Sequence, residues 1–150
     1  MSDISISTIT SGSPKYKEVF ELRDEILRRP LGRELKNDDL SRDHIDTIFI
    51  AEHEGRTIGC VLLRRLSDEE VQLRAMAVYN EWQGKGVGRM LVQALEKHTQ
   101  EQGYARVVLH ARKVALGFYS SLGYTISGGE FTEVGIPHYI MQKNVAGKIL

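Results

Sequence analysis

The clearest hydrophobic pattern in the chain lies between residues 87 and 102. Its members recur at positions i, i+3, i+4, i+7, i+8 and i+11, which is the spacing of one face of an α-helix. They are Val87, Met90, Leu91, Ala94, Leu95 and His98. Gly103 follows, and glycine is typical of the position just after a helix. The pattern therefore predicts an amphipathic helix from Val87 to about Gln102.

Shorter segments alternate apolar with polar residues or are apolar throughout, which is typical of β-strands. They are residues 4–9, 47–52, 56–63, 71–78, 106–110, 124–126 and 138–141. The turn His53-Glu54-Gly55 predicts a hairpin between the second and third of them. The glycine-bearing residues 127–137 are predicted to be a loop that joins the last two strands.

Two more helices are predicted. Apolar residues between Val19 and Leu27 form a helical face that should end near Pro30, because the residue before a proline disfavours the helical conformation. Residues 114–122 form a shorter helical segment, and the polar residues 31–46 are predicted to be a loop with a short helix.

The predicted elements follow the order β-α-(α)-β-β-β-α-β-α-β-β, with an antiparallel meander first and a βαβ unit after it. This order indicates the α/β (α+β) class, with a mixed central sheet flanked by helices. A length of 150 residues fits one domain, so residues 1–150 are predicted to form a single domain.

The composition is that of an ordinary globular protein, with 41% hydrophobic and 27% charged residues. The 20 basic and 20 acidic side chains balance, so the overall charge predicts no nucleic-acid or membrane partner. Residues 1–5 show no signal-peptide pattern, and no apolar stretch has the length of a membrane span. The single cysteine, Cys60, cannot form an intrachain disulfide, which fits a cytoplasmic location.

Three alternating glycines lie between the predicted strand 71–78 and the long helix. They are Gly84, Gly86 and Gly88. Without Cβ atoms, such a loop can bring backbone N–H groups close to a ligand, and a helix start favours phosphate. The loop is not a P-loop, because no Ser or Thr follows Lys85. It is not a dinucleotide-binding fingerprint either, because Arg89 takes the third glycine position and no carboxylate follows about 20 residues later.

The segment from Leu73 to Leu91 resembles the central strand, loop and helix of the GNAT superfamily of N-acetyltransferases. Its glycine loop matches the pattern Gln/Arg-x-x-Gly-x-Gly/Ala, which binds the coenzyme A pyrophosphate in that family. The segment from Ala115 to Tyr124 resembles the second signature of the family. Both signatures stand in the family's order and spacing, and the resemblance covers roughly residues 45–143. It implies a GNAT-like acyl-CoA N-acyltransferase fold, of the uncharacterised bacterial, stand-alone type.

The resemblance implies acetyl-CoA as the cofactor. Backbone groups of Met76, Ala77 and Val78 would pair with the pantetheine where the central strand splays from its parallel neighbour. An N–H group of Ala77 or Val78 would polarise the thioester carbonyl. The glycine loop and the helix start would hold the pyrophosphate through Gln83, Gly84, Lys85, Gly86, Val87, Gly88 and Arg89. Without a ligand, the strand would be part of the core and the loop would be a turn before a helix.

Tyr119 matches a tyrosine that many GNAT enzymes place beside the sulfur as general acid. A phenol has an ordinary pKa of about 10, so it is protonated at neutral pH and can donate to a thiolate. The alternative is that Tyr119 packs as an ordinary half-buried aromatic residue beside Leu116 and Phe118. Lys113 stands where many members have an Asn that contacts the cofactor, so the chain departs from the family pattern there.

The general base has no carboxylate candidate early on the central strand, where many members have a Glu. This strand offers Gln72, Leu73 and Arg74 instead, so an ordered water or another side chain would serve as the base.

Residues 131–138 resemble a segment of some uncharacterised bacterial members, and they would place Glu133 and His138 beside the acceptor site. A structural hydrogen bond is the alternative role for His138, and also for His110 at the end of its predicted strand. The five histidines show no metal-ligand spacing, so no metal is expected.

These features predict an N-acetyltransferase that moves an acetyl group from acetyl-CoA to a primary amine by direct transfer in a ternary complex. A covalent route would need Cys60, which is predicted to be a small core residue in the middle of a strand. The alternative is a non-catalytic acyl-CoA sensor or scaffold, which the missing strand carboxylate favours and Tyr119 opposes. A nucleotide-binding redox domain is disfavoured by the loop spacing and the order of elements.

The sequence favours no particular acceptor, and a small-molecule amine rather than a protein is the default for a compact stand-alone chain. Residues 31–46 are predicted to cover part of the acceptor side, and their mixed charges favour no substrate charge. The charged residues are Arg33, Glu34, Lys36, Asp38, Asp39 and Arg42. Family members often dimerise, so a homodimer is a further expectation.

Overall fold

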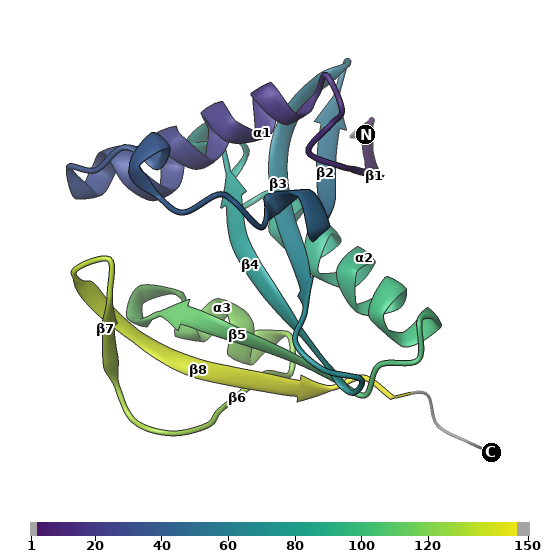
Figure 1. Cartoon of the computed structure of the whole chain (residues 1–150), viewed down its shortest axis with the longest axis vertical. Helices are drawn as coiled ribbons and strands as arrows, with labels where there is room; N and C mark the ends of the chain where they lie inside the picture. Colours follow the sequence, from purple (N-terminus) through teal and green to yellow (C-terminus); the bar gives the residue numbers. More distant parts are fainter. Residues whose placement is uncertain (1–2, 147–150) are drawn as a thin grey trace.

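The computed structural model describes residues 3–146, and its centre is one mixed sheet with the strand order β1-β2-β3-β4-β5-β8-β6 (Figure 1). The strands are β1 (Ile4–Ile9), β2 (Thr47–His53), β3 (Arg56–Arg65), β4 (Glu70–Val78), β5 (Arg106–Arg112), β6 (Thr125–Ile126), β7 (Phe131–Glu133) and β8 (Ile136–Asn144). Strands β1 to β4 form an antiparallel meander, and β4 pairs with β5 in parallel. The predicted meander followed by a βαβ unit is therefore confirmed.

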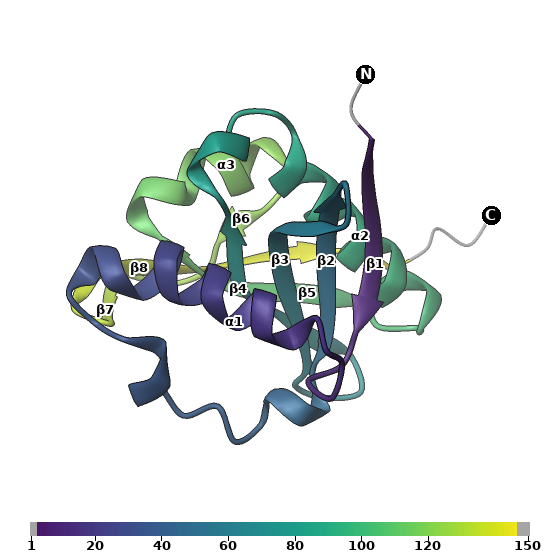
Figure 2. The same ribbon diagram turned by 90° about the horizontal axis from the view of Figure 1, so that it is seen from above.

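Helical segments cover both faces of the sheet (Figure 2). The α-helices are α1 (Tyr16–Arg23), α2 (Val87–Glu101) and α3 (Leu116–Ser121). The short π and 3₁₀ turns are η1 (Asp24–Arg28), η2 (Arg29–Leu31), η3 (Leu35–Asn37), η4 (Asp43–Ile45), η5 (Asn80–Trp82) and η6 (Lys113–Ala115). Among residues 3–146, no helix has the length and apolar character needed to cross a membrane.

Two hydrophobic clusters lie on opposite faces of the sheet. On one face, α1 buries Val19 and Leu22 against β2 and β3. On the other face, α2 buries Leu91 and Leu95 in a cluster that also contains residues of β4 and β5. The first face is called the α1 face below, and the second the α2 face. The predicted apolar face of α2 is thus confirmed as a core face.

The sheet splits between β4 and β5. Their parallel pairing begins at Glu70 and Arg106 and ends at Leu73 and Leu109. Beyond that point β4 turns away from β5, so that the two strands form a V in Figure 1. The remaining residues of β4 pair only with β3.

A bulge in β4 accompanies the split. Cys60 of β3 faces Ala77 while Leu62 faces Arg74, so β4 has one residue more than β3 over this stretch. Ala75, inside the bulge, has a φ of +50°, which is uncommon for a residue with a side chain. Such a bulge bends its strand and increases the local twist. We attribute the departure of β4 from β5 to this bend.

One sequence-based assignment was wrong. Residues 127–137 were predicted to be a loop, but Phe131–Glu133 form β7, which pairs with the start of β8 in a tight hairpin. The turn residues Val134 and Gly135 have positive φ values, as such a hairpin turn requires. Three residues with mostly exposed side chains give too short a pattern to recognise. A strand boundary was also wrong, because β5 runs on to Arg112, so His110 lies inside its strand and not at the end.

Other predictions hold, with small shifts. The first helix continues through η1 and η2 past Pro30. The hairpin of β2 and β3 turns at Glu54 and Gly55, and His53 is the last residue of β2. Two predictions include residues outside the described range and stay predictions. They are the single domain of residues 1–150 and the absence of a signal peptide in residues 1–5.

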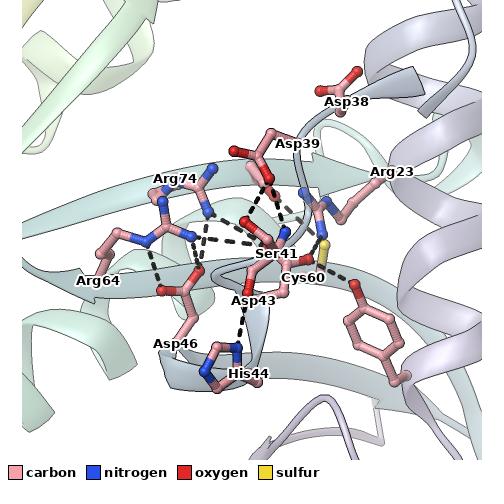
Figure 3. Close-up of polar contacts among 12 residues, drawn as sticks. Arg23, Asp38, Asp39, Ser41, Asp43, His44, Asp46, Cys60, Arg64 and Arg74 are labelled. Carbon is pink, nitrogen blue, oxygen red and sulfur yellow. Dashed lines mark hydrogen bonds and ion pairs between the residues drawn. The ribbon is translucent and has the colours of Figure 1, made fainter. Parts of the chain in front are cut away.

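Buried ion pairs hold the segment before β2 on the α1 face (Figure 3). Asp43 accepts hydrogen bonds from the Tyr16 hydroxyl (2.6 Å) and from Nη1 of Arg23 (2.8 Å). Asp46 accepts two from Arg64, at 2.8 and 3.0 Å, and one from Nη1 of Arg74 at 2.9 Å. We call these residues the ion cluster. Because the partners lie on α1, β3 and β4, the cluster fastens the segment to the sheet.

The charge of Asp43 should contribute to stability in a pH-dependent way. Burial alone would raise the pKa of Asp43, but the hydrogen bonds from Tyr16 and Arg23 outweigh burial and hold it below its ordinary value. A carboxyl whose pKa is lower in the folded state stabilises the fold above its unfolded-state pKa, about 3.9. That contribution is lost as the pH falls through the lower, folded-state value.

We expect Asp43→Asn to lower the free energy of unfolding by on the order of 3 kcal/mol at pH 7, because it leaves Arg23 buried without its charge partner. The difference from the wild type should shrink as the pH falls below about 4. Urea unfolding at pH 7 and pH 3 measures both. Asp68→Asn is the control, since Asp68 is exposed and pairs only with Arg65. An equal decrease in the free energy of unfolding at the two pH values would contradict the prediction.

Candidate active site

A cavity of about 860 Å³ occupies the split between β4 and β5. Residues 72–78 of β4 line it, together with the glycine loop, Phe118 and Tyr119 of α3, the β7–β8 hairpin, and η1 with residues 35–40. Elements on both faces of the sheet therefore border one space. Leu35, Asp38, Asp39 and Leu40 line the cavity, so part of the 31–46 segment borders it, and its place on the acceptor side stays a prediction.

The glycine loop leads directly into α2. Gly84 and Gly86 have φ values of +75° and +86°, and apart from each glycine and its chain neighbours no protein atom lies within 4 Å of the place where its Cβ would be. The first bond of the helix runs from the N–H of Met90 to the carbonyl of Gly86 (3.0 Å), so the preceding N–H groups have no partner within the helix. This open cradle of backbone donors fits a pyrophosphate.

The other residues of the loop have different roles. Gln83 donates to the carbonyl of Val78 (2.9 Å) and so ties the loop to the end of β4. Lys85 lies over the ring of Trp82, and the Val87 side chain is buried in the core, so Val87 offers a ligand only its backbone. A Cβ on Gly88 would lie 3.2 Å from Cζ of Phe118, so this glycine serves the packing of α3 on α2. Gln83, Gly84, Gly86, Gly88 and Arg89 line the cavity.

Residues 76–78 of β4 also line the cavity. The side chains of Ala77 and Val78 are buried, and the pairing with β5 has already ended at Leu73. Backbone groups on this edge of β4 are therefore not used by a ladder with β5. The predicted splay of the central strand is confirmed, and Ala77 and Val78 are also part of the core, while the pairing of this edge with pantetheine stays a prediction.

Tyr119 lies on α3 and lines the cavity. It is 7% exposed, and its ring packs edge-on against Phe118 and Tyr124, with centroids 5.1 and 5.8 Å away. Burial raises the pKa of the Tyr119 phenol well above its ordinary value, and the nearby charge of Arg112 offsets this only in part. The hydroxyl is therefore protonated at neutral pH and can act as a donor.

The β7–β8 hairpin brings Glu133 between two histidines. Its Oε1 lies 2.9 Å from Nδ1 of His110, and its Oε2 lies 3.7 Å from Nε2 of His138. His138 is 3% exposed, and its Nδ1 lies 2.9 Å from the carbonyl of Ile136. Since a carbonyl only accepts, Nδ1 is the donor in this contact, and Nε2 is the nitrogen that faces Glu133. All three side chains line the cavity.

Five arginines around the cavity were not singled out from the sequence as site residues. They are Arg23, Arg28, Arg64, Arg74 and Arg112. A signal for two of them was present, because Arg74 follows the buried Leu73 of β4 and Arg112 follows the buried Ala111 of β5. Polar residues at alternate positions of a strand share one face.

Comparison with known proteins supports the same fold. The family model of the acetyltransferase (GNAT) domain matches residues 17–145. The uncharacterised protein YyaT of Bacillus subtilis is 32% identical over 113 residues, which cover 71% of this chain and 76% of that protein.

Two solved structures illustrate the structural likeness. A candidate N-acetyltransferase from Lactobacillus plantarum superposes with a TM-score of 0.84 at 21% identity, over 95% of this chain and 98% of that one. A GNAT family acetyltransferase from Elizabethkingia anophelis, solved with acetyl-CoA bound, gives a TM-score of 0.72 at 18% identity, over 95% and 98% of the two chains. At these identities the likeness shows the fold.

The family model extends from α1 to the end of β8 and so includes every element around the cavity. The fold class and the family resemblance predicted from the two sequence signatures are thereby confirmed. The chain belongs to the GNAT family of acetyltransferases.

Proposed function

We propose that this protein transfers the acetyl group of acetyl-CoA to the primary amine of a small molecule, directly within a ternary complex. The observation that carries the proposal is the split of the sheet. One cavity in this split is lined both by the glycine loop on the α2 face, which would hold the pyrophosphate, and by the His110–Glu133–His138 group beside the α1 face. The cavity volume lies in the range of small-molecule sites, and acetyl-CoA and the acceptor would share it.

Acetyl-CoA, the cofactor implied by the family, supplies the activated acetyl group as a thioester. The N–H groups of Gly84, Gly86 and the first turn of α2 would hold its pyrophosphate, with charge support from Arg89. The free backbone edge at residues 76–78 would hold the pantetheine. An N–H group of Ala77 or Val78 would polarise the acetyl carbonyl.

Tyr119 would serve as the general acid. Tyr119 lines the cavity, and its buried, protonated hydroxyl would donate to the leaving sulfur. Its packing against Phe118 and Tyr124 holds the ring in place, so the structural and catalytic roles support each other.

Glu133 would accept the proton of the amine. It is the most exposed member of the His110–Glu133–His138 group, so an amine in the cavity reaches it first. His110, whose Nδ1 lies 2.9 Å from Oε1, would hold the carboxylate in place, and His138 would offer Nε2 as a second acceptor. Glu133 would thus supply the carboxylate that the central strand lacks, which weakens the main argument for a non-catalytic sensor.

Direct transfer fits the state of the only thiol in the sequence. Cys60 is fully buried between β2 and β4, and burial raises its pKa to about 12. A thiol in this state is neither ionised nor accessible, so it is a poor nucleophile. A covalent acetyl-cysteine intermediate is therefore disfavoured.

The glycine loop can be tested with Gly86→Asn. Asn tolerates a positive φ, and the protein leaves its side chain room, so only a bound ligand should be obstructed. We expect the Kd for acetyl-CoA to rise at least about tenfold, by isothermal titration. Gly103→Asn, at a similar positive φ beyond the other end of α2, is the matched control and should bind like the wild type. Unchanged binding by a folded Gly86→Asn protein would exclude this loop as the phosphate site.

The general acid can be tested with Tyr119→Phe. Only the hydroxyl is lost, so packing and acetyl-CoA affinity should be retained while kcat falls by about 10² to 10⁴. Single-turnover kinetics measure the transfer step itself. Tyr124→Phe is the control, because its hydroxyl bonds Glu96 (2.8 Å) outside the cavity and its loss should lower stability alone. An unchanged single-turnover rate for Tyr119→Phe would leave this tyrosine a packing residue.

The base can be tested with Glu133→Gln, which keeps the shape of the side chain but cannot take up a proton. We expect the single-turnover rate to fall by about 10² to 10⁴ with acetyl-CoA affinity retained. Glu130→Gln is the matched control, since Glu130 precedes the same hairpin and pairs with Lys113 (3.3 Å). If both variants transfer acetyl at the wild-type rate, Glu133 is not the base.

A further inference from the structure

Two arginines flank the split of the sheet on its α1 face. Arg74 follows Leu73, the last residue of β4 that pairs with β5. Arg112 ends β5 and lies directly opposite His138 of β8, so their side chains share a face. Leu73 and Leu109 belong to the core of the α2 face, so their neighbours Arg74 and His110 point to the α1 face. The two arginines and the His110–Glu133–His138 group thus border one side of the cavity.

Arg74 is the outermost arginine of the ion cluster. The exposed side-chain fractions are 3% for Arg23, 12% for Arg64 and 23% for Arg74. These three guanidinium groups share two carboxylates, Asp43 and Asp46, so the cluster carries one positive charge in excess. Arg64 already binds both oxygens of Asp46, and Arg74 adds a single bond through Nη1. The other nitrogens of Arg74 have no hydrogen-bond partner among residues 3–146, and the residue lines the cavity.

Arg112 has no carboxylate within ion-pair distance in the described part of the chain. Its Nη2 donates to the backbone carbonyl of Leu27 in η1 (2.8 Å), so the side chain crosses from β5 to the helix on the far side of the cavity. Burial and the repulsion of Arg28 lower its pKa, as burial and the repulsion of Arg64 do for Arg74. Both cations are thus short of negative charge.

The acidic groups of the same cavity are already engaged. Asp38 pairs with Arg28 (2.8 Å), Asp39 accepts from the backbone and hydroxyl of Ser41 (3.0 and 2.6 Å), and Glu133 lies between His110 and His138. The proton-accepting group and the two under-compensated guanidinium groups are therefore separate features of one wall. An acceptor that fits this wall has an amine for the proton-accepting group and an anion for the two guanidinium groups.

We infer that the acceptor is a small primary amine that also carries a carboxylate, as amino acids do, and that Arg74 and Arg112 bind this carboxylate. The planar fork of a guanidinium matches the two oxygens of a carboxylate, and such charge-assisted bonds strengthen in a partly buried site. The inference rests on the proposed function and adds the chemical class of its acceptor.

The test compares matched acceptors. Standard amino acids are paired with their carboxamides, and 4-aminobutyrate with butylamine, and thiol release from acetyl-CoA gives kcat/KM for each. We expect the carboxylate member of the preferred pair to react at least about tenfold better than its neutral partner, as a charge-assisted hydrogen bond allows. An amine with a phosphonate in place of the carboxylate should react more slowly, and a preference for it would overturn the assignment of the anion.

Variants of Arg112 connect the preference to the residue. Arg112→Gln leaves no aspartate without its partner, so it should fold, and the carboxylate-to-neutral ratio of kcat/KM should fall toward one. Arg112→Lys keeps the charge and should restore part of the ratio. Arg65→Gln is the matched control, because Arg65 is exposed at the far end of β3 and pairs only with Asp68.

The outcomes separate this inference from the function on which it rests. The inference is overturned, and the proposed function is kept, if the protein acetylates amines with no preference for a carboxylate. The same holds if the preference survives in both Arg112→Gln and Arg74→Gln. Acetyl-CoA binding without transfer to any amine overturns the proposed function, and the inference falls with it.

Discussion

The site depends on one interruption of hydrogen bonding, the end of the β4–β5 ladder after Leu73 and Leu109. A parallel pair that continued would bury the edge of β4, and no ligand could reach its backbone. One extra residue in β4 bends the strand away while β3 keeps it in the sheet. The result is a pair of strand edges with unused donors and acceptors, which would be costly if nothing satisfied them. The cavity lies where water or a ligand can do so.

The α1 face needs a different kind of support from the α2 face. On the α2 face, Leu91 and Leu95 of α2 pack in a continuous apolar core. On the α1 face, the segment before β2 has little apolar surface of its own and is fastened by Asp43 and Asp46 to arginines of α1, β3 and β4. Ion pairs of this kind add little net stability compared with a packed core, but they fix the positions of the groups involved. They also leave a guanidinium at the cavity wall, which an apolar core could not provide.

Much of this arrangement could be predicted from the chain alone. The period of α2, the hairpin of β2 and β3 and the glycine loop are local patterns, and each appears where its residues predict it. The β7 strand was missed because three residues carry no recognisable period, and its pairing with β8 is set by the turn at Val134 and Gly135. The approach of His110 to Glu133, 23 positions apart, depends on that hairpin and so could not be derived from spacing. The arginine of β5 reaches a carbonyl 85 positions earlier in the chain, a contact that only the fold defines.

Gly88 has a consequence for the length of the ligand that the cavity can take. Because it has no side chain, Phe118 packs directly against the first turn of α2, and Tyr119, the next residue, is carried to the cavity by the same helix. The packing of Phe118 on Gly88 therefore joins the start of α2 to the helix that carries Tyr119. In the proposed function one end of this contact faces the pyrophosphate and the other faces the sulfur. The packing of α3 on α2 would then set the distance between the pyrophosphate site and the phenol. An extended pantetheine arm that matches this distance would bring its sulfur to the phenol without any movement of the protein.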